Sequence, residues 1–127
     1  MRVRSPVVLA CVAAALLVGC GGGYEADVSA AGPGTVVMTD YAFHPRDVHV
    51  RRGQTVNVLN QGGIAHNLKV ERGPNPRRET DELAGTPSFL KGDTEQLRID
   101  LEPGRYVMVC SVPGHRELGM TGRLTVR

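Results

Sequence analysis

The stretch VHVRRGQTVNVLN, residues 48–60, contains two runs in which apolar and polar side chains alternate on either side of Gly53. Valines recur at every second position in both runs. Strict alternation is typical of a β-strand with one buried face, and a glycine between two such runs is typical of a turn. The stretch therefore predicts two consecutive strands joined by a turn.

Further strand patterns lie on both sides of this stretch. Upstream, TVVMTDYAF (Thr35–Phe43) is β-branched and aromatic at its ends, and Pro45 closes it. Downstream, four more segments have strand patterns: AHNLKVERG (65–73), EQLRIDLEPG (95–104), RYVMVC (105–110) and TGRLTVR (121–127). No long segment shows a 3.6-residue period, so the short strands predict an all-β sandwich or barrel. Residues 73–93 are rich in Pro, Gly and polar side chains, which predicts a loop with a helical turn near Arg78–Leu83.

One cysteine, Cys110, ends a predicted strand and opens the loop CSVPGHRELGM. The same loop holds His115 and Met120, so a thiol, an imidazole and a thioether follow one another with the spacing C-x4-H-x4-M. Copper centres that transfer electrons use two imidazoles and one thiolate in a plane, with a distant thioether on the axis. A Pro-Gly pair between the thiol and the imidazole stands where such a loop must turn. The loop therefore predicts three of the four ligands of a copper site.

The remaining ligand, a second histidine, must come from elsewhere in the chain. His49 alternates with apolar neighbours on a predicted strand and is expected to face solvent, while His44 directly precedes Pro45 at a strand end. His66 follows the turn QGGIA and opens a predicted strand, a place from which a side chain projects at the edge of a sandwich. His66 ranks first, although composition alone leaves all three histidines open.

Together these patterns resemble the cupredoxins, the small blue copper proteins, over nearly all of Thr35–Arg127. The motif Y-x-F-x-P at 41–45 is similar to an early strand of that family, and V-x-V-x-x-G-x-T-V-x-V-x-N at 48–60 is similar to its continuation. The ligand loop, with four residues in each gap, resembles that of auracyanin and rusticyanin more than that of plastocyanin, whose first gap is shorter. The resemblance implies an antiparallel Greek-key β-sandwich with one type 1 copper ion at one end.

The resemblance also implies roles for single residues. The copper ligands of the family fall on His66, Cys110, His115 and Met120. Asn67 would hydrogen-bond toward the cysteine loop and restrain the ligands, or would alternatively satisfy its own local backbone as a turn residue. Electrons would pass through the edge of the second histidine, which in cupredoxins reaches the surface within an apolar patch. That electron-transfer surface would consist of His115, Val112, Pro113 and Leu118.

The N-terminus has the pattern of an export signal. Two arginines precede an uninterrupted apolar run from Val7 to Gly19, which is shorter than the roughly 20 residues of a membrane span. The run closes in Leu-Val-Gly-Cys20, which resembles the lipobox of bacterial lipoproteins, where the cysteine is acylated and becomes the first mature residue. We expect a signal peptide at 1–19, a lipid on Cys20 and a flexible linker at 20–34. The alternatives are an uncleaved anchor, a buried helix or a soluble secreted protein.

Removal of this signal peptide would leave 13 basic and 13 acidic side chains, because two of the 15 basic residues lie within it. A near-neutral chain without a basic stripe argues against nucleic-acid binding. We expect a monomer that is extracytoplasmic and held by lipid to a bacterial membrane. Its partners would be redox proteins of a respiratory or photosynthetic system.

Other copper proteins and enzymes fit these residues less well. A CuA loop needs two cysteines, and multicopper oxidases and copper nitrite reductases add histidine-rich sites, often H-x-H, a motif that this sequence lacks. A Cys–His nucleophile would need an open pocket and a third orienting group, and it would leave the methionine unexplained. We therefore expect an electron carrier and not an enzyme. The alternative is a protein of copper delivery or homeostasis, although the sequence has no Met-rich or His-rich tract.

Overall fold

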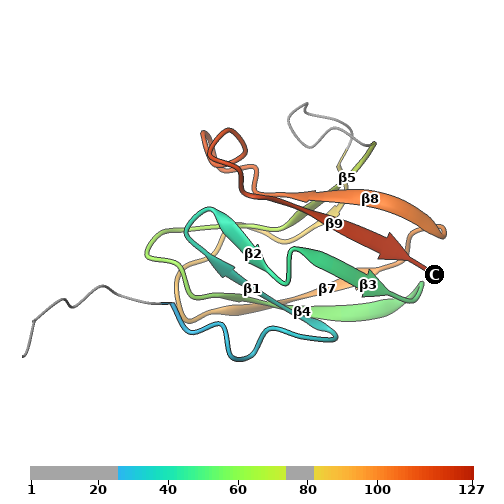
Figure 1. Cartoon of the computed structure of the whole chain (residues 1–127), viewed down its shortest axis with the longest axis horizontal. Helices are drawn as coiled ribbons and strands as arrows, with labels where there is room; N and C mark the ends of the chain where they lie inside the picture. Colours follow the sequence, from blue (N-terminus) through green and yellow to red (C-terminus); the bar gives the residue numbers. More distant parts are fainter. Residues whose placement is uncertain (1–25, 74–81) are drawn as a thin grey trace, which may run out of the picture.

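The structure, a computed structural model, describes residues 26–73 and 82–127, which form nine β-strands and no helix. One sheet has four strands in the order β2-β1-β4-β7, with the bounds β1 Thr35–Thr39, β2 Ala42–His44, β4 Gln54–Asn60 and β7 Thr94–Ile99. The other has five strands in the order β3-β9-β8-β5-β6, with the bounds β3 Asp47–Val50, β5 Lys69–Arg72, β6 Glu82–Gly85, β8 Gly104–Val109 and β9 Thr121–Val126. Figure 1 shows the two sheets as facing layers.

The expected all-β sandwich is confirmed, but its sheets are mixed and not purely antiparallel. Among the described strands, β1 pairs with β4 and β3 with β9 in parallel, whereas the other pairings are antiparallel. The parallel pairs arise because the chain changes sheets. After β2 it enters the five-stranded sheet as β3 and then returns to the four-stranded sheet as β4. Parallel neighbours need such a crossover, whereas antiparallel neighbours need only a short turn.

The core lies between the two sheets and follows the alternation in the sequence. All four valines of residues 48–60 are buried. The inward side chains of the last three strands pack in the same cluster: Leu97, Ile99, Met108, Leu124 and Val126. Burying one side chain of this size contributes about 1.5–3 kcal/mol. If β3 or β4 shifted by one residue against its neighbouring strand, the valines of residues 48–60 would face solvent. Burial of these valines therefore also fixes the register of the strands.

One local expectation is wrong, and another falls mostly outside the described residues. The segment Thr35–Phe43 is not one strand but a hairpin, because Tyr41 takes a left-handed conformation with φ 64° and β2 folds back on β1. The last two residues of the segment Arg78–Leu83, where a helical turn was expected, lie in β6, at an irregularity in its pairing with β5. Residues 78–81 of that segment lie outside the described residues.

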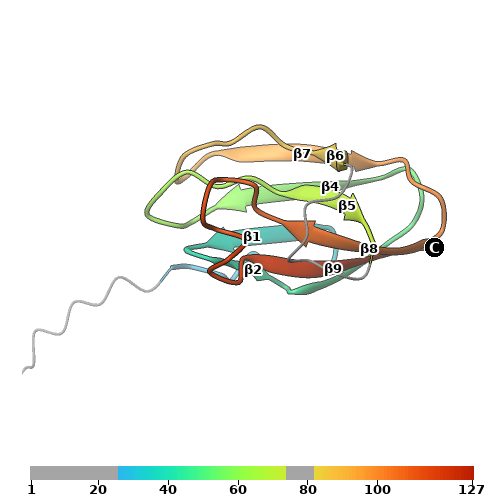
Figure 2. The same cartoon turned by 90° about the horizontal axis from the view of Figure 1, so that it is seen from above.

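Three connections between strands lie at the same end of the sandwich. The last residue of β4 lies beside Met38 near the end of β1, and the last residue of β8 lies between the first residues of β5 and β9. Both views show the β8–β9 loop at the end opposite the C-terminus (Figures 1 and 2). Three segments therefore meet there: the β1–β2 turn, the β4–β5 loop and the β8–β9 loop.

The N-terminal expectations fall mostly outside this description. The predicted signal peptide at 1–19 and Cys20 lie among residues that the structure does not describe. The last residues of the predicted linker are bonded to the domain, since the Asn57 N–H donates to the Gly34 carbonyl at 2.9 Å. No helix in residues 26–73 and 82–127 is long and apolar enough to cross a membrane.

Candidate metal centre

The loop between β8 and β9 carries three of the predicted ligands and folds back on itself. The Cys110 N–H donates to the Met120 carbonyl at 3.1 Å, and the Met120 N–H donates to the His115 carbonyl at 3.0 Å. The His115 N–H in turn donates to the Val112 carbonyl at 3.0 Å. Gly114 has φ 84°, a left-handed conformation that glycine adopts without steric cost. These bonds bring the thiol, imidazole and thioether residues together, and all three are buried.

The β4–β5 loop supplies His66, which is fully buried. Its backbone exchanges two hydrogen bonds with Phe89, at 3.3 and 3.0 Å. The buried Asn60 side chain holds the same loop. Its amide donates to the carbonyls of Ile64 and Phe89 at 3.0 and 2.7 Å, and its oxygen accepts the Gly62 N–H at 2.8 Å. One amide thus joins two points of the loop to Phe89 in the segment between β6 and β7, which fixes where the histidine projects.

The structure brings His66, and not His44 or His49, to the cysteine loop. His44 Nε2 lies 3.0 Å from the Thr39 hydroxyl on the neighbouring strand, and His49 is exposed on β3. Within the described residues, His66, Cys110 and His115 form the one group of His, Cys, Asp or Glu side chains able to hold a metal ion.

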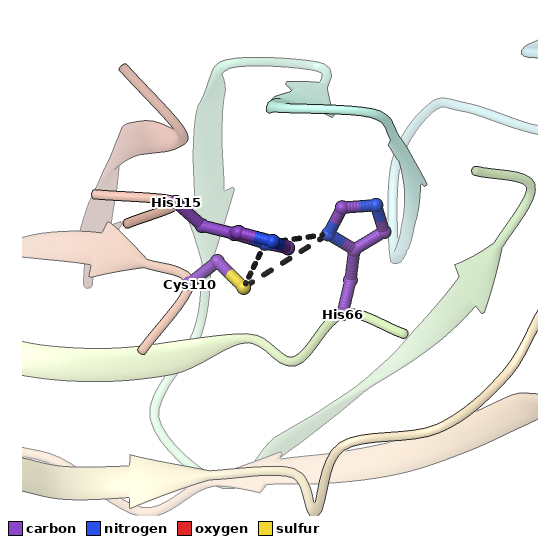
Figure 3. A group of neighbouring side chains, drawn as sticks. All are labelled: His66, Cys110 and His115. Atoms are coloured by element: carbon purple, nitrogen blue, oxygen red, sulfur yellow. Dashed lines mark hydrogen bonds between the residues drawn. The ribbon is translucent and has the colours of Figure 1, made fainter. Parts of the chain in front are cut away.

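The three donor atoms form a small triangle (Figure 3). The two Nδ1 atoms are 3.1 Å apart, and the sulfur lies 3.4 Å from Nδ1 of His115 and 4.0 Å from Nδ1 of His66. A point equidistant from all three atoms lies about 2.1 Å from each, close to the metal–nitrogen and metal–sulfur bonds of about 2.0–2.3 Å found for zinc. The donors are therefore spaced to hold one ion in their plane.

Burial shifts the pKa of two of these donors, Cys110 and His115. It raises the pKa of the Cys110 thiol, while the backbone N–H groups of Asn67 and Val112 act in the opposite direction by hydrogen-bonding the sulfur. It lowers the pKa of His115, as does the neighbouring His66, against an opposing effect of Asp40. A neutral imidazole is the form that binds a metal, and the two N–H donors favour the thiolate that metal binding requires.

Asn67 joins the histidine loop to the cysteine loop. Its side-chain oxygen accepts the backbone N–H of Ser111 at 2.9 Å, and its amide donates to the hydroxyls of Ser111 and Ser88, both at 3.0 Å. The side chain therefore does not serve only its own local backbone. Asn67, which follows His66, is thereby bonded to Ser111, which follows Cys110.

Two further residues of the site were missed by sequence reasoning. Asp40 Oδ1 lies 2.9 Å from Nε2 of His66, and the ring of Tyr41 stands edge-on to both imidazoles, with its centroid 5.1 Å from that of His115. Both belong to the β1–β2 turn, which the sequence suggested was the interior of one strand. The only local signal was an aspartate, a turn-forming residue, inside an otherwise β-branched run.

An ion pair anchors the ligand loop from its outer side. Arg116, next to His115, donates to both carboxylate oxygens of Glu71 on β5, at 2.6 and 3.0 Å. The side chains are only 10% and 4% exposed. Two parallel bonds of this kind give geometric specificity as well as energy. Arg116, and with it the loop beside His115, is thus fixed to the five-stranded sheet.

Comparison with known proteins identifies the family. The model of the copper-binding proteins of the plastocyanin/azurin family matches residues 30–127. The chain belongs to this family. The resemblance to cupredoxins is thereby confirmed, and copper is the metal of the centre. A buried Cys–His–His triangle with Met120 beside it has the donor set and planar arrangement of a single type 1 copper site.

Individual relatives are distant and mostly longer than the part they share with this chain. The copper-resistant cuproprotein CopI of Rubrivivax gelatinosus is 29% identical over 72% of the chain and 64% of its own length. A chloroplastic plastocyanin of Physcomitrium patens is 31% identical over 66% of the chain and 49% of its own length. Among solved structures, auracyanin from Roseiflexus castenholzii matches with a TM-score of 0.61 at 23% identity, over 73% of this chain and 94% of its own, which supports the fold.

Proposed function

We propose that this protein is a one-electron carrier held at a bacterial membrane, and not an enzyme. Copper in such a site cycles between Cu(I) and Cu(II). The observation that carries the proposal is the closed triangle of His66, Cys110 and His115, which is buried and spaced for one ion. His66, Cys110, His115 and Met120 would hold the copper ion.

The surrounding residues support such a role because they would hold the ligands in one arrangement in both oxidation states. Asn67 connects the two ligand loops, and the Glu71–Arg116 ion pair fixes the residue beside His115. The donors are buried, which excludes water from the metal. Electron transfer is fast when the ligands move little as the charge of the metal changes.

The test is a visible spectrum of the copper-loaded protein followed by a potentiometric titration. We expect an intense thiolate-to-copper band that disappears and returns with a one-electron dependence on potential. A loaded protein without this band, or one whose copper is lost on reduction, would contradict the proposal.

The proposed electron-transfer surface surrounds His115, which is 6% exposed. Leu118 in the same loop is 61% exposed, Pro113 is exposed and Val112 is half-buried. Tyr41, which contacts the imidazole from the β1–β2 turn, is also exposed and extends this apolar surface. Such a surface lets two redox proteins approach closely without desolvating charges.

A charge within this surface should slow electron exchange without changing the metal site. We expect Leu118→Lys to lower the electron self-exchange rate about tenfold or more, because two molecules would then bring like charges together at the contact. The blue band should stay unchanged. The matched control is Gln96→Lys on the outer face of β7, which adds the same charge away from the loop. Equal rates for the two variants, measured by NMR line broadening, would place the contact elsewhere.

Copper delivery or homeostasis is the second candidate, favoured by the similarity to the copper-resistant cuproprotein CopI. Retention of the metal distinguishes the two functions. An electron carrier should keep its copper through repeated reduction in the presence of a strong Cu(I) chelator such as bathocuproine disulfonate. A copper-handling protein should release it to the chelator at the first reduction.

Membrane attachment through Cys20 forms the last part of the proposal, and it is supported by the lipobox-like sequence that precedes this residue. Two or more acyl chains anchor a protein stably, whereas a single chain does not. Expressed in a bacterium with its N-terminus intact, the protein should fractionate with membranes, and its mature first residue should be an acylated Cys20 by mass spectrometry. Cys20→Ser should abolish the acylation. An unmodified N-terminus in the parent would contradict the anchor.

A further inference from the structure

The carboxylate of Asp40 contacts the side of His66 that faces away from the metal donors. Asp40 Oδ1 lies 2.9 Å from Nε2, whereas Nδ1 of the same ring lies 3.1 Å from Nδ1 of His115 and 4.0 Å from the Cys110 sulfur. The imidazole is fully buried, and the side chain of Asp40 is 47% exposed. The ring therefore has one nitrogen directed to the metal site and the other to an anion at the surface.

The β4–β5 loop is built around this contact. The Gly63 N–H donates to the same Oδ1 atom of Asp40 at 2.9 Å. At Gly62 an added Cβ would lie 2.5 Å from that oxygen and 2.7 Å from Nε2 of His66, so no larger residue fits without displacing one of them. The His66 ring and the backbone N–H of Gly63 both bond Oδ1 of Asp40, which favours the carboxylate form. An aspartate is an anion at neutral pH.

We propose that Asp40 is a positioning residue of the copper centre, which selects the tautomer of His66 and lowers the reduction potential of the metal. The inference rests on the proposed function for its redox part. By accepting the Nε2–H, the carboxylate leaves Nδ1 unprotonated and directed at Cys110 and His115. A histidine that binds a metal through one nitrogen commonly donates the other N–H to such a group, which orients the ring and raises its basicity.

The sign of the redox effect follows from charge. Cu(II) carries one more positive charge than Cu(I), so an anion beyond the imidazole stabilises the oxidised state more. Partial exposure of Asp40 weakens this interaction through solvent screening. We expect Asp40→Asn, which keeps an acceptor oxygen but removes the charge, to shift the Cu(II)/Cu(I) equilibrium about tenfold toward Cu(I), or about 59 mV for one electron.

The experiment compares four proteins: the parent, Asp40→Asn, Asp40→Ala and Asp100→Asn. Asp100 is a matched control because it is also an exposed aspartate in an ion pair, with Arg52, and it follows β7 at the end of the sandwich away from the metal loops. The first readout is the reduction potential of the copper-loaded proteins. The second is made on the metal-free proteins, where ¹⁵N NMR shifts of the imidazoles report which nitrogen of His66 carries the proton.

We expect both Asp40 variants to have a higher potential than the parent, with Asp100→Asn unchanged. In the metal-free parent, His66 should carry its proton on Nε2, and Asp40→Ala should lose this preference. Unchanged potentials together with an unchanged tautomer in Asp40→Ala would overturn the proposal, as would an equal potential shift in Asp100→Asn. Failure of the proposed function is separate, since it would appear as a missing blue band in the parent, while the tautomer measurement would still decide the role of Asp40.

Discussion

Cys110→Ser is expected to abolish the intense visible band of the copper-loaded protein. The band arises from charge transfer from a thiolate to Cu(II), and a serine hydroxyl at the same position supplies neither the sulfur nor a readily formed anion. Cys110 is fully buried and its sulfur lies 3.4 Å from Nδ1 of His115, so the thiolate would be lost from the donor triangle. Copper bound by the two remaining histidines should be pale and more weakly held.

Two controls make this result interpretable. Ser111→Ala changes the neighbouring side chain but keeps the backbone N–H that donates to Asn67, and it should retain the band. Far-UV circular dichroism of metal-free Cys110→Ser should match the parent, because a sulfur-to-oxygen change removes no β-sheet contact. A variant that folds and keeps its full band would show that the thiolate is not a ligand.

Glu71→Ala should lower the free energy of unfolding by about 3–5 kcal/mol, because it removes the carboxylate to which the buried guanidinium of Arg116 donates two hydrogen bonds. The measurement is urea unfolding of the copper-free protein, which removes the contribution of metal binding to the folded state. Glu71→Gln, which keeps the shape and removes the charge, should show the loss of the ion pair with little change in packing.

The chain offers a matched control for this pair in the same sheet. Asp47 and Arg123 also form a two-bond carboxylate–guanidinium contact, but their side chains are 49% and 78% exposed. Asp47→Ala should therefore change stability little, since solvent screens exposed pairs. If Glu71→Ala proves no more destabilising than Asp47→Ala, the buried pair is not an anchor of the ligand loop.

The parts of the fold that depend on local periodicity could be predicted from the sequence. Alternating valines in residues 48–60 predicted two strands with one buried face, and both formed. The spacing of Cys110, His115 and Met120 predicted one loop with converging donors, because short gaps leave little freedom to the backbone. His66 lies far from them in sequence, and it ranks first among the histidines because it follows a turn and opens a predicted strand.

What the sequence did not predict depends on contacts between distant segments. No spacing rule connects Asp40 with His66, because their contact requires both the left-handed turn at Tyr41 and the loop that Asn60 holds. The parallel pairing of β3 with β9 likewise depends on where the chain changes sheets, and alternation is the same in parallel and antiparallel edge strands. Both the Asp40–His66 contact and the β3–β9 pairing therefore depend on the tertiary structure and not on local sequence.

The β4–β5 loop leaves the four-stranded sheet and enters the five-stranded one, so His66 sits on the segment that joins the two layers. Its partners Cys110 and His115 belong to the five-stranded layer alone, and Asp40 belongs to the four-stranded layer. The packing of the two layers, about 10 Å apart in packed sheets, therefore contributes to where His66 stands relative to the other donors. Mutations of core valines remote from the copper should thus alter its visible absorption band and its reduction potential. The spectrum of the bound metal would then report changes in the spacing of the two sheets.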